Sequence, residues 1–335
     1  MSLRRILAVF VARNREFFRD RGTLSWSIIL PFAIVFGFAF AFSGSAPERY
    51  TIGVLGTPDA ARQALGIDHV EYTQVADRET GVEKVRRHQL DLLVDLDAGR
   101  YWVSDASPKG YLLERVLRGV TAQQPSGLER QAVPGRTIRY VDWLVPGLLA
   151  MNMMFTALFG VGFVIVRYRK NGVLKRLKAT PLTPAEFLVA QLASRLLIIV
   201  AITSAIFVGS NAVLDFPILG SWVLLLLILV LGGICLISLG LIIAARTASE
   251  ELAGGLLNML SWPMMFLSGV WFSTEGLHPW LQGLARALPL THVIEAARAV
   301  MIDGAGLAEI APNLVALAAM SAVFLALGAA LFRWE

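Results

Sequence analysis

The chain alternates long apolar stretches with short polar segments, and six of the stretches have the length of a membrane span. A helix needs about 20 predominantly apolar residues to cross the hydrocarbon core of a bilayer. The six predicted spans cover residues 22–43, 142–166, 187–214, 218–245, 252–272 and 311–332. Pro263 interrupts the fifth stretch, but a kinked helix can still span because neighbouring helices satisfy the freed carbonyl. The pattern predicts an α-helical polytopic membrane protein with six transmembrane helices.

The composition supports the same class of protein. Of the 335 residues, 56% are hydrophobic and 16% are charged, against about 25% charged residues in an average soluble domain. The mean hydropathy is +0.62. Cys235 is the lone cysteine and can form no intrachain disulfide, and the four histidines lack the short spacings of a zinc site. The sequence predicts no metal site and no catalytic residue.

One polar segment is set inside this apolar chain. Residues 44–139 hold 26 of the 55 charged residues, divided into 13 acids and 13 bases. Within the segment, short apolar runs alternate with charged helical stretches and with Gly/Pro turns. The predicted strands are 50–55, 70–75, 91–96 and 101–104, and the predicted helices are 59–65, 77–89 and 109–122. The pattern predicts a small α/β domain inserted between the first and second spans.

Four aspartates of this domain could be drawn as a calcium site, namely Asp91, Asp95, Asp97 and Asp105. Calcium loops place oxygen ligands at tightly repeated positions around one turn, with a glycine at a set place. Here Asp91 and Asp95 instead flank a predicted strand, and Arg100 would compete for them. We interpret the four side chains as strand ends and turn caps.

The distribution of Lys and Arg predicts the topology, because these residues mark the cytoplasmic loops of membrane proteins. Six arginines lie in residues 1–21, and six basic residues lie in residues 167–178. Two predicted spans separate these clusters, so both lie on one side. Both termini are then cytoplasmic, and the 44–139 domain is extracytoplasmic. No cleaved signal peptide is expected, since Ala41-Phe42-Ser43 is a poor cleavage site. The basic excess is assigned to topology because no nucleic-acid-binding motif accompanies it.

Two polar segments on the predicted cytoplasmic side have helical patterns. In residues 1–21 the apolar side chains except Val9 fall on one side of a helical wheel and the charged ones on the other, which is typical of an amphipathic helix in the membrane interface. The same arginines also fit a positive-inside anchor for the first span. In the loop 167–186, the apolar residues between 173 and 177 recur at helical spacing. Thr183 and Glu186 have the spacing of a capping box at the start of the next helix.

Several motifs resemble those of a known family. They are Gly172-Val173-Leu174-Lys175-Arg176-Leu177-Lys178-Ala179-Thr180-Pro181, Phe266-Leu267-Ser268-Gly269, Pro279-Trp280-Leu281, Leu288-Pro289-Leu290-Thr291-His292 and Ile294-Glu295-Ala296-Ala297-Arg298. Together they resemble the permease of type-2 ATP-binding-cassette (ABC-2) transporters, in the branch with a large extracytoplasmic domain between spans one and two. The loop departs from the family pattern, because basic residues surround its glycine where the family usually carries acids. His292 and Glu295 replace the usual Tyr and Asp.

The resemblance implies a permease subunit of an exporter whose ATP is hydrolysed by a separate subunit. The chain has no G-x-x-x-x-G-K-[ST] phosphate loop, so ATP and Mg²⁺ are expected in the partner. The implied partners are two copies of a cytoplasmic ABC ATPase and a second permease copy, as a homodimer or a paralogous heterodimer. Whether a periplasmic adaptor is a further partner stays open, and no nucleic acid is expected to bind. The implied location is a prokaryotic plasma (inner) membrane, with residues 273–304 forming a re-entrant, amphipathic segment.

The motifs and spans also give candidate site residues. The residues expected to couple the loop to the ATPase are Arg169, Gly172, Leu174, Lys175, Arg176, Leu177 and Pro181. The C-terminal family motif is expected at Ser268, Gly269, Pro279, Trp280, Pro289, Glu295 and Arg298. The candidate substrate path is lined by Asn152, Met153, Met154, Asn258, Met264 and Phe266, since methionine surfaces adapt to varied apolar ligands. The spans carry no charge array suited to a polyanion, which favours an amphipathic or hydrophobic substrate.

Two other functions stay open from the sequence. An ion-coupled secondary carrier would place ionisable residues or broken helices at the bilayer midplane. Pro263 points that way, whereas Arg195 and Asp142 lie near the ends of their spans. A non-transporting receptor or assembly module would use the 44–139 domain and need the spans only as an anchor.

Overall fold

The computed structural model describes residues 2–41, 50–67, 70–121, 129–133, 140–247, 249–332 and 334. The chain divides into two compact units. Unit 1 consists of residues 1–41 and 140–335, and unit 2 of residues 42–139. The predicted limits of the inserted domain, at residues 44 and 139, lie outside the described residues.

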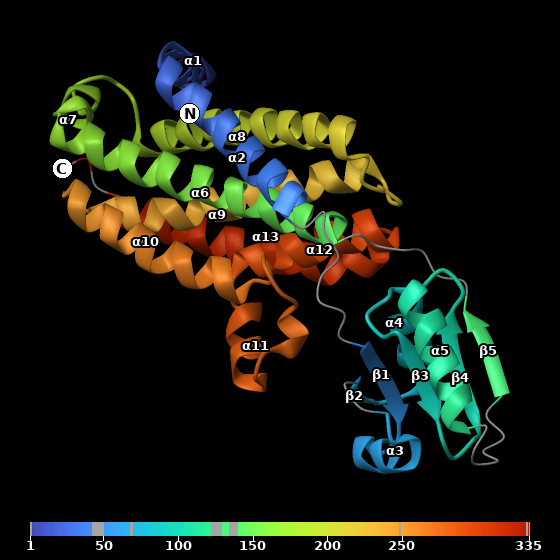
Figure 1. The fold of residues 1–335 in the computed structure, drawn as a ribbon. Helices are drawn as coiled ribbons and strands as arrows, with labels where there is room; N and C mark the ends of the chain where they lie inside the picture. The colour runs from blue at the N-terminus through green and yellow to red at the C-terminus, as the bar shows by residue number, and fades with distance from the viewer. Residues whose placement is uncertain are drawn as a thin grey trace. The chain divides into compact units, whose positions relative to one another are not determined.

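Unit 1 is a bundle of helices that lie side by side (Figure 1). Its helices are α1 (Leu3–Arg19), α2 (Arg21–Ala41), α6 (Tyr140–Lys170), α7 (Val173–Lys178), α8 (Pro184–Leu214), α9 (Trp222–Arg246), α10 (Glu250–Leu267), α11 (Pro279–Arg286), α12 (Pro289–Asp303) and α13 (Leu307–Leu331). The predicted short helix in the loop after the second span is present as α7.

Among the described residues, α6, α8, α9 and α13 are each long and apolar enough to cross a membrane. The pair α1 and α2 passes the same test together, with a bend of 65° between the two helices, which gives up to five spans where the sequence predicted six. The remaining predicted span corresponds to α10. This helix has 18 residues and begins with Glu250 and Glu251, so its apolar part is shorter than the predicted stretch.

The fifth predicted span, 252–272, is longer than the helix that forms there. α10 ends at Leu267, and Gly269 follows with a φ angle of +82°, a conformation that glycine adopts without steric cost. Pro263 lies inside α10, which continues past it. A 3-10 turn at Thr274–Gly276, α11 and α12 then precede α13.

The core of unit 1 is centred on α9, which packs against α6, α8, α12 and α13. Small residues allow the close contacts. A Cβ atom placed on Gly240 would lie 3.1 Å from the backbone oxygen of Leu158 in α6, so a larger residue would push the two helices slightly apart. Membrane helices use small residues in this way to bring their backbones together.

Both ends of the chain lie at the same end of unit 1 as α7 (Figure 1). The backbone N–H of Ser2 donates to Glu186 at the start of α8, and the ring of Trp334 lies 5.5 Å from that of Phe187. The opposite end is marked by Tyr140, the first residue of α6. Because α6 has 31 residues, about 46 Å of helix separates the two ends.

Unit 2 contains a mixed sheet, with the strand order β2-β1-β3-β4-β5 among the described residues. The strands are β1 (Tyr50–Leu55), β2 (Val70–Val75), β3 (Leu92–Asp95), β4 (Arg100–Ser104) and β5 (Glu129–Val133). The helices are α3 (Pro58–Leu65), α4 (Arg78–Arg86) and α5 (Pro108–Thr121). Each strand and helix predicted for this segment is present within a few residues, whereas β5 was not predicted.

The aspartates of unit 2 make contacts within the domain. Asp91 accepts a hydrogen bond from the backbone N–H of Thr51 at 2.8 Å, at the point where β1 and β3 pair. Asp95 accepts from the N–H of Ala98 at 2.9 Å and so caps the turn after β3. Asp105 pairs with Arg130 of β5. These side chains hold strand ends and turns together.

Candidate functional site

The loop between α6 and α8 forms a short helix with one buried face. α7 begins after Gly172, whose φ angle is +69°. Leu174 is fully buried and Leu177 is half-buried, while Lys175 and Arg176 are exposed. Full burial of a leucine side chain contributes about 1.5–3 kcal/mol. The apolar face therefore holds α7 on the bundle, and the basic face points outward.

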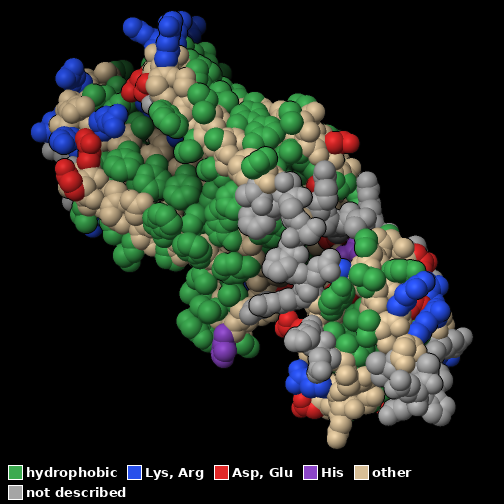
Figure 2. All heavy atoms as spheres, in the orientation of Figure 1, with side chains coloured by type: hydrophobic (Ala, Val, Ile, Leu, Met, Phe, Trp, Pro, Cys, Tyr) green, Lys and Arg blue, Asp and Glu red, His purple; other side chains and the backbone are tan. Residues whose placement is uncertain are grey.

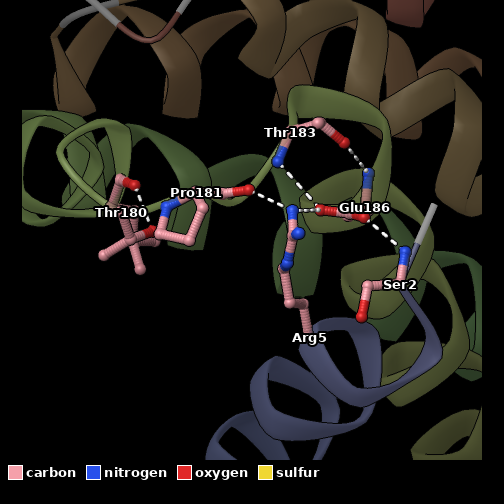
Figure 3. Close-up of polar contacts among 7 residues, drawn as sticks. Ser2, Arg5, Thr180, Pro181, Thr183 and Glu186 are labelled. Carbon is pink, nitrogen blue, oxygen red and sulfur yellow. Dashed lines mark hydrogen bonds and ion pairs between the residues drawn. The ribbon is translucent and has the colours of Figure 1, made fainter.

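The carboxylate of Glu186 joins α1 to this loop (Figure 3). Its oxygens accept hydrogen bonds from the backbone N–H of Ser2 at 2.6 Å and of Thr183 at 3.0 Å. The Arg5 guanidinium lies 3.4 Å from the same carboxylate and also donates to the carbonyl of Pro181. The Thr183 hydroxyl accepts from the Glu186 N–H, which confirms the predicted capping box. The Glu186 side chain is 1% exposed, so its charge acts within the molecule.

A second group of contacts holds the middle of α1. The Arg13 guanidinium donates to Gln191 of α8 at 2.9 Å, to the Tyr168 hydroxyl of α6 at 2.7 Å and to Glu16 at 2.6 Å. The Tyr168 hydroxyl in turn donates to Glu16. α1 is therefore tied to both helices that flank the α7 loop.

Arg169, at the end of α6, contacts the next inter-helix loop. Its guanidinium donates to carbonyls at the C-terminus of α9, which belong to Ala244, Ala245 and Thr247. The neighbouring Lys170 lies 3.7 Å from Glu250 at the start of α10. The carbonyls at a helix end lack partners inside the helix, and a cation there is also favoured by the helix dipole. Arg169 thus joins α6 to the α9–α10 connection.

Arg195 forms a third internal link, deeper in the bundle. Its guanidinium donates to the Thr156 carbonyl of α6 at 2.9 and 2.6 Å and lies 5.8 Å from the ring centre of Phe17 in α1. The space that it fills exists because residue 160 is glycine. A Cβ atom at Gly160 would lie 1.6 Å from the guanidinium.

At the Tyr140 end of unit 1, part of the C-terminal motif is assembled around Arg298. The guanidinium lies 3.5 Å from the ring centre of Trp143, donates to the Trp143 carbonyl at 3.1 Å and reaches the Val270 carbonyl at 3.4 Å. Val270 directly follows Ser268 and Gly269, which are buried. Arg298 of α12 therefore connects α6 to the end of α10.

Glu295 lies three residues before Arg298 on α12, and the remaining motif residues do not join this cluster. Pro279 and Pro289 begin α11 and α12, as expected for proline in the first helical turn. Trp280 is 65% exposed, and Glu295 is also exposed. The structure therefore gives these residues helix-start and surface positions.

A largely apolar cavity of about 320 Å³ lies between α6, α8, α9 and α12. Its lining includes Pro146, Met153, Thr203, Ser204, Trp222 and Met301. Met153 is the one candidate path residue in this lining. The others are distributed elsewhere: Met154 and Met264 are fully buried, Asn152 is half-buried, and Asn258 and Phe266 are exposed on α10.

Comparison with known proteins gives the family. The family described as "ABC-2 type transporter" matches residues 99–302, which is more than half of the chain. The chain belongs to the ABC-2 type transporter family. It is a transporter permease and a membrane protein with transmembrane helices. Permeases of this family are not catalytic themselves and work with ATP-binding subunits.

Curated relatives of this ABC-2 permease are named as transport proteins. It is 26% identical over 256 residues to the inner membrane transport permease YhhJ of Escherichia coli (strain K12), covering 73% of this chain and 68% of the relative. It is 23% identical to the probable multidrug ABC transporter permease YbhR of the same organism, covering 50% of this chain and 46% of the relative. It is 24% identical to the daunorubicin resistance ABC transporter permease protein DrrB1 of Streptomyces coeruleorubidus, covering 59% of this chain and 70% of the relative.

The ties between α1 and the loop were not predicted from the sequence. Glu186 was recognised as part of a capping box, but Ser2 and Arg5 were not linked to it. Tyr168 was not singled out either. No local pattern could pair Arg5 with Pro181, because 176 positions separate them, and α1 lies outside the residues that the family matches.

Proposed function

We propose that this permease exports an amphipathic or hydrophobic substrate with energy from a separate ATP-binding subunit, which docks on α1 and the α7 loop. The observation that carries the proposal is the Glu186 carboxylate, which fastens Ser2 and Arg5 of α1 to the loop. α1 and the loop thereby form one surface, named here the coupling surface: α1 and residues 171–186.

The coupling surface is basic. Figure 2 shows Lys and Arg side chains gathered at the end of unit 1 that carries α1 and α7. The sequence of residues 171–186 contains one acidic residue, Glu186. Its side chain is buried and turned toward Ser2 and Arg5. Lys175 and Arg176 face outward. Since charge complementarity steers association, the partner should present acidic side chains where α7 docks.

Movement of the coupling surface would be passed on through Arg169 and Lys170. Arg169 holds the C-terminal carbonyls of α9, and Lys170 pairs with Glu250 of α10. We propose that these residues transmit ATPase closure rather than touch the ATPase. Alternating access would follow if the ATPase bound two arrangements of these helices with different affinity.

A second permease copy is proposed to pack along the exposed face of α10. Asn258 and Phe266 of the candidate path share this face with Met259, which is 75% exposed, and Trp262, which is 52% exposed. The path would then run between two copies, and the cavity beside Met153 would take apolar parts of the substrate. An apolar substrate fits the wall of this cavity, and the names of YbhR and DrrB1 refer to multidrug transport and daunorubicin resistance.

The topology is proposed from the basic residues. Both termini and α7 share one end of unit 1, which we place in the cytoplasm of a prokaryotic cell, with unit 2 on the outer side of the inner membrane. Two ATPase copies would serve the dimer. Unit 2 would be the part available to a periplasmic adaptor.

The test is co-expression of the permease with its ATP-binding subunit. Lys175→Glu combined with Arg176→Glu should abolish co-purification and reduce ATP hydrolysis in membranes to the level without permease. Arg286→Glu is the matched control, because Arg286 is also exposed but lies at the end of α11. Unchanged co-purification and hydrolysis in the double variant would refute docking through α7.

A further inference from the structure

α1 and α8 enclose an open groove of about 330 Å³. Its apolar wall comes from Phe10, Val11 and Phe18 of α1 and from Leu197 of α8. Phe18 is 55% exposed and Leu197 is 48% exposed. The two other large side chains of the lining are Arg15 and Arg19.

The apolar and basic side chains of α1 occupy adjacent strips. At 100° per residue, the exposed Leu3, Leu7, Val11 and Phe18 fall within an arc of about 80°. Measured from Leu3, at which this arc begins, Arg15 and Arg19 lie at about 120° and 160°. An apolar strip beside a basic strip is the pattern of a helix that lies at the boundary between acyl chains and headgroups.

Arg15 and Arg19 have charge available for a ligand. Both are exposed, and among the described residues no acidic side chain pairs with either of them. Glu16, on the same helix, is turned away toward Arg13 and Tyr168. The spacing of four residues places the two guanidinium groups one helical turn apart on the same side.

Taking α2 as a span, we place the groove at the depth of the headgroups from the helix lengths. α2 has 21 residues and is about 31 Å long, which equals the thickness of the hydrocarbon core. Its first residue, Arg21, therefore lies at one boundary, two residues after Arg19. Counting about 20 residues back from Leu214 along α8 reaches Arg195, next to Leu197.

One further polar residue lines the groove. Asn14 is 9% exposed and belongs to the lining. Its amide nitrogen donates to the Phe10 carbonyl at 2.9 Å, whereas its amide oxygen has no hydrogen-bonding partner among the described residues.

We propose that the groove binds one anionic phospholipid of the leaflet at the α7 end. The lipid phosphate lies between Arg15 and Arg19, and one acyl chain runs along Phe18, Val11 and Leu197. The lipid would fill the space between α1 and α8 from the bilayer side. The proposal rests on membrane insertion and not on the docking of an ATPase.

The test uses the full-length permease in detergent, titrated with dioctanoyl phosphatidylglycerol or dioctanoyl phosphatidylcholine and followed by native mass spectrometry. The wild-type chain should bind the anionic lipid more tightly than the zwitterionic one. Arg15→Gln with Arg19→Gln should weaken phosphatidylglycerol binding about 30-fold, at about fivefold for each arginine near a lipid surface. Arg15→Lys with Arg19→Lys should retain most of the binding.

Arg4→Gln is the matched control, because Arg4 is an exposed arginine of α1 that does not line the groove. It should leave binding unchanged, and inorganic phosphate should not displace the lipid. Thermal midpoints without lipid should agree among all variants. Equal binding of the two lipids, or unchanged phosphatidylglycerol binding in the double Gln variant, would overturn the proposal. Loss of binding in Arg4→Gln would also count against it, since it would indicate nonspecific attraction to the whole helix.

Discussion

The Glu186 carboxylate accepts a hydrogen bond from the backbone N–H of Ser2 at 2.6 Å, although 184 positions separate the two residues. Through this contact the beginning of the chain is fixed to the beginning of α8. The same carboxylate caps α8 and faces Arg5. One buried acid therefore sets the position of α1 relative to the loop that carries α7.

Removal of the Glu186 carboxylate should release α1. In Glu186→Ala the hydrogen bonds to Ser2, Thr183 and Arg5 are all lost, so the amides of α1 should exchange with deuterium much faster than in the wild type. Glu186→Gln keeps an acceptor oxygen for the backbone donors but loses the charge facing Arg5. It should have an intermediate effect.

The matched control for this prediction is Glu251→Gln. Glu251 is an exposed acid in the first turn of α10 that accepts a hydrogen bond from the Ser249 hydroxyl. Its substitution should leave exchange in α1 unchanged. Exchange in α1 that is equally slow in Glu186→Ala and in the wild type would show that other contacts hold the helix.

Arg169 and Lys175 should give different defects. Arg169→Lys keeps the positive charge but cannot donate to several carbonyls of α9 as a guanidinium does. The ATP-binding subunit should still co-purify with this variant, while stimulation of ATP hydrolysis by substrate falls severalfold. Lys175→Glu should reduce co-purification itself. The measurements are pull-down yield and substrate-stimulated hydrolysis on the same preparations, and loss of co-purification in Arg169→Lys would place Arg169 in the docking contact.

Gly160 and Arg195 should be energetically coupled. Gly160→Ala introduces a Cβ atom where the guanidinium lies, so Arg195 must move away from the Thr156 carbonyl, and we expect a lower thermal midpoint. In an Arg195→Ala background the same change should be neutral or raise the midpoint, because alanine favours a helix by about 1 kcal/mol over glycine. A thermal double-mutant cycle in detergent measures this, with a coupling of about 0.5–3 kcal/mol expected for residues in contact. Additive effects would contradict the packing.

Unit 2 should lose order at the start of α4 in acid. The Asp77 carboxylate accepts hydrogen bonds from the backbone N–H and the hydroxyl of Thr80, and these bonds hold the pKa of Asp77 below its usual value. A lowered pKa in the folded state means that the stabilisation is complete above the unfolded pKa of about 3.9 and is lost as pH falls through the folded pKa.

The measurement is hydrogen exchange of the α4 amides between about pH 6 and pH 2.5, corrected for the intrinsic pH dependence of exchange. Asp77→Asn caps a helix without ionising, so it should remove the acid-dependent loss of protection. Asp97→Asn, an exposed turn residue, should behave as the wild type does. The same acid sensitivity in Asp77→Asn would assign it to another group.

Much of the local structure was predictable because it depends on near neighbours in the chain. The capping box of Thr183 and Glu186, the amphipathic α7 and the strands β1 to β4 follow from spacing that a few residues define. The end of α10 could not be predicted in this way, because Ser268 and Gly269 lie within an apolar run of the sequence. β5 was missed since its sequence, Glu129-Arg130-Gln131-Ala132-Val133, lacks a clear alternation.

The candidate site was only partly predictable for a related reason. The exposed Lys175 and Arg176 were placed on a loop helix from local pattern. Arg169 was assigned to the same group, yet its guanidinium is turned to the end of α9, a contact with residues about 75 positions away. Contacts between distant segments depend on how the helices pack, and a single sequence holds no local record of them.

The most direct test of ATPase docking is site-specific crosslinking from the coupling surface. A photoreactive benzoylphenylalanine placed at Lys175 should crosslink to the ATP-binding subunit in membranes, and the yield should change when ATP is added. The same probe at Arg286 should give no such product. Crosslinking from Arg286 but not from Lys175, or none from Lys175 while the complex is intact, would contradict docking through α7.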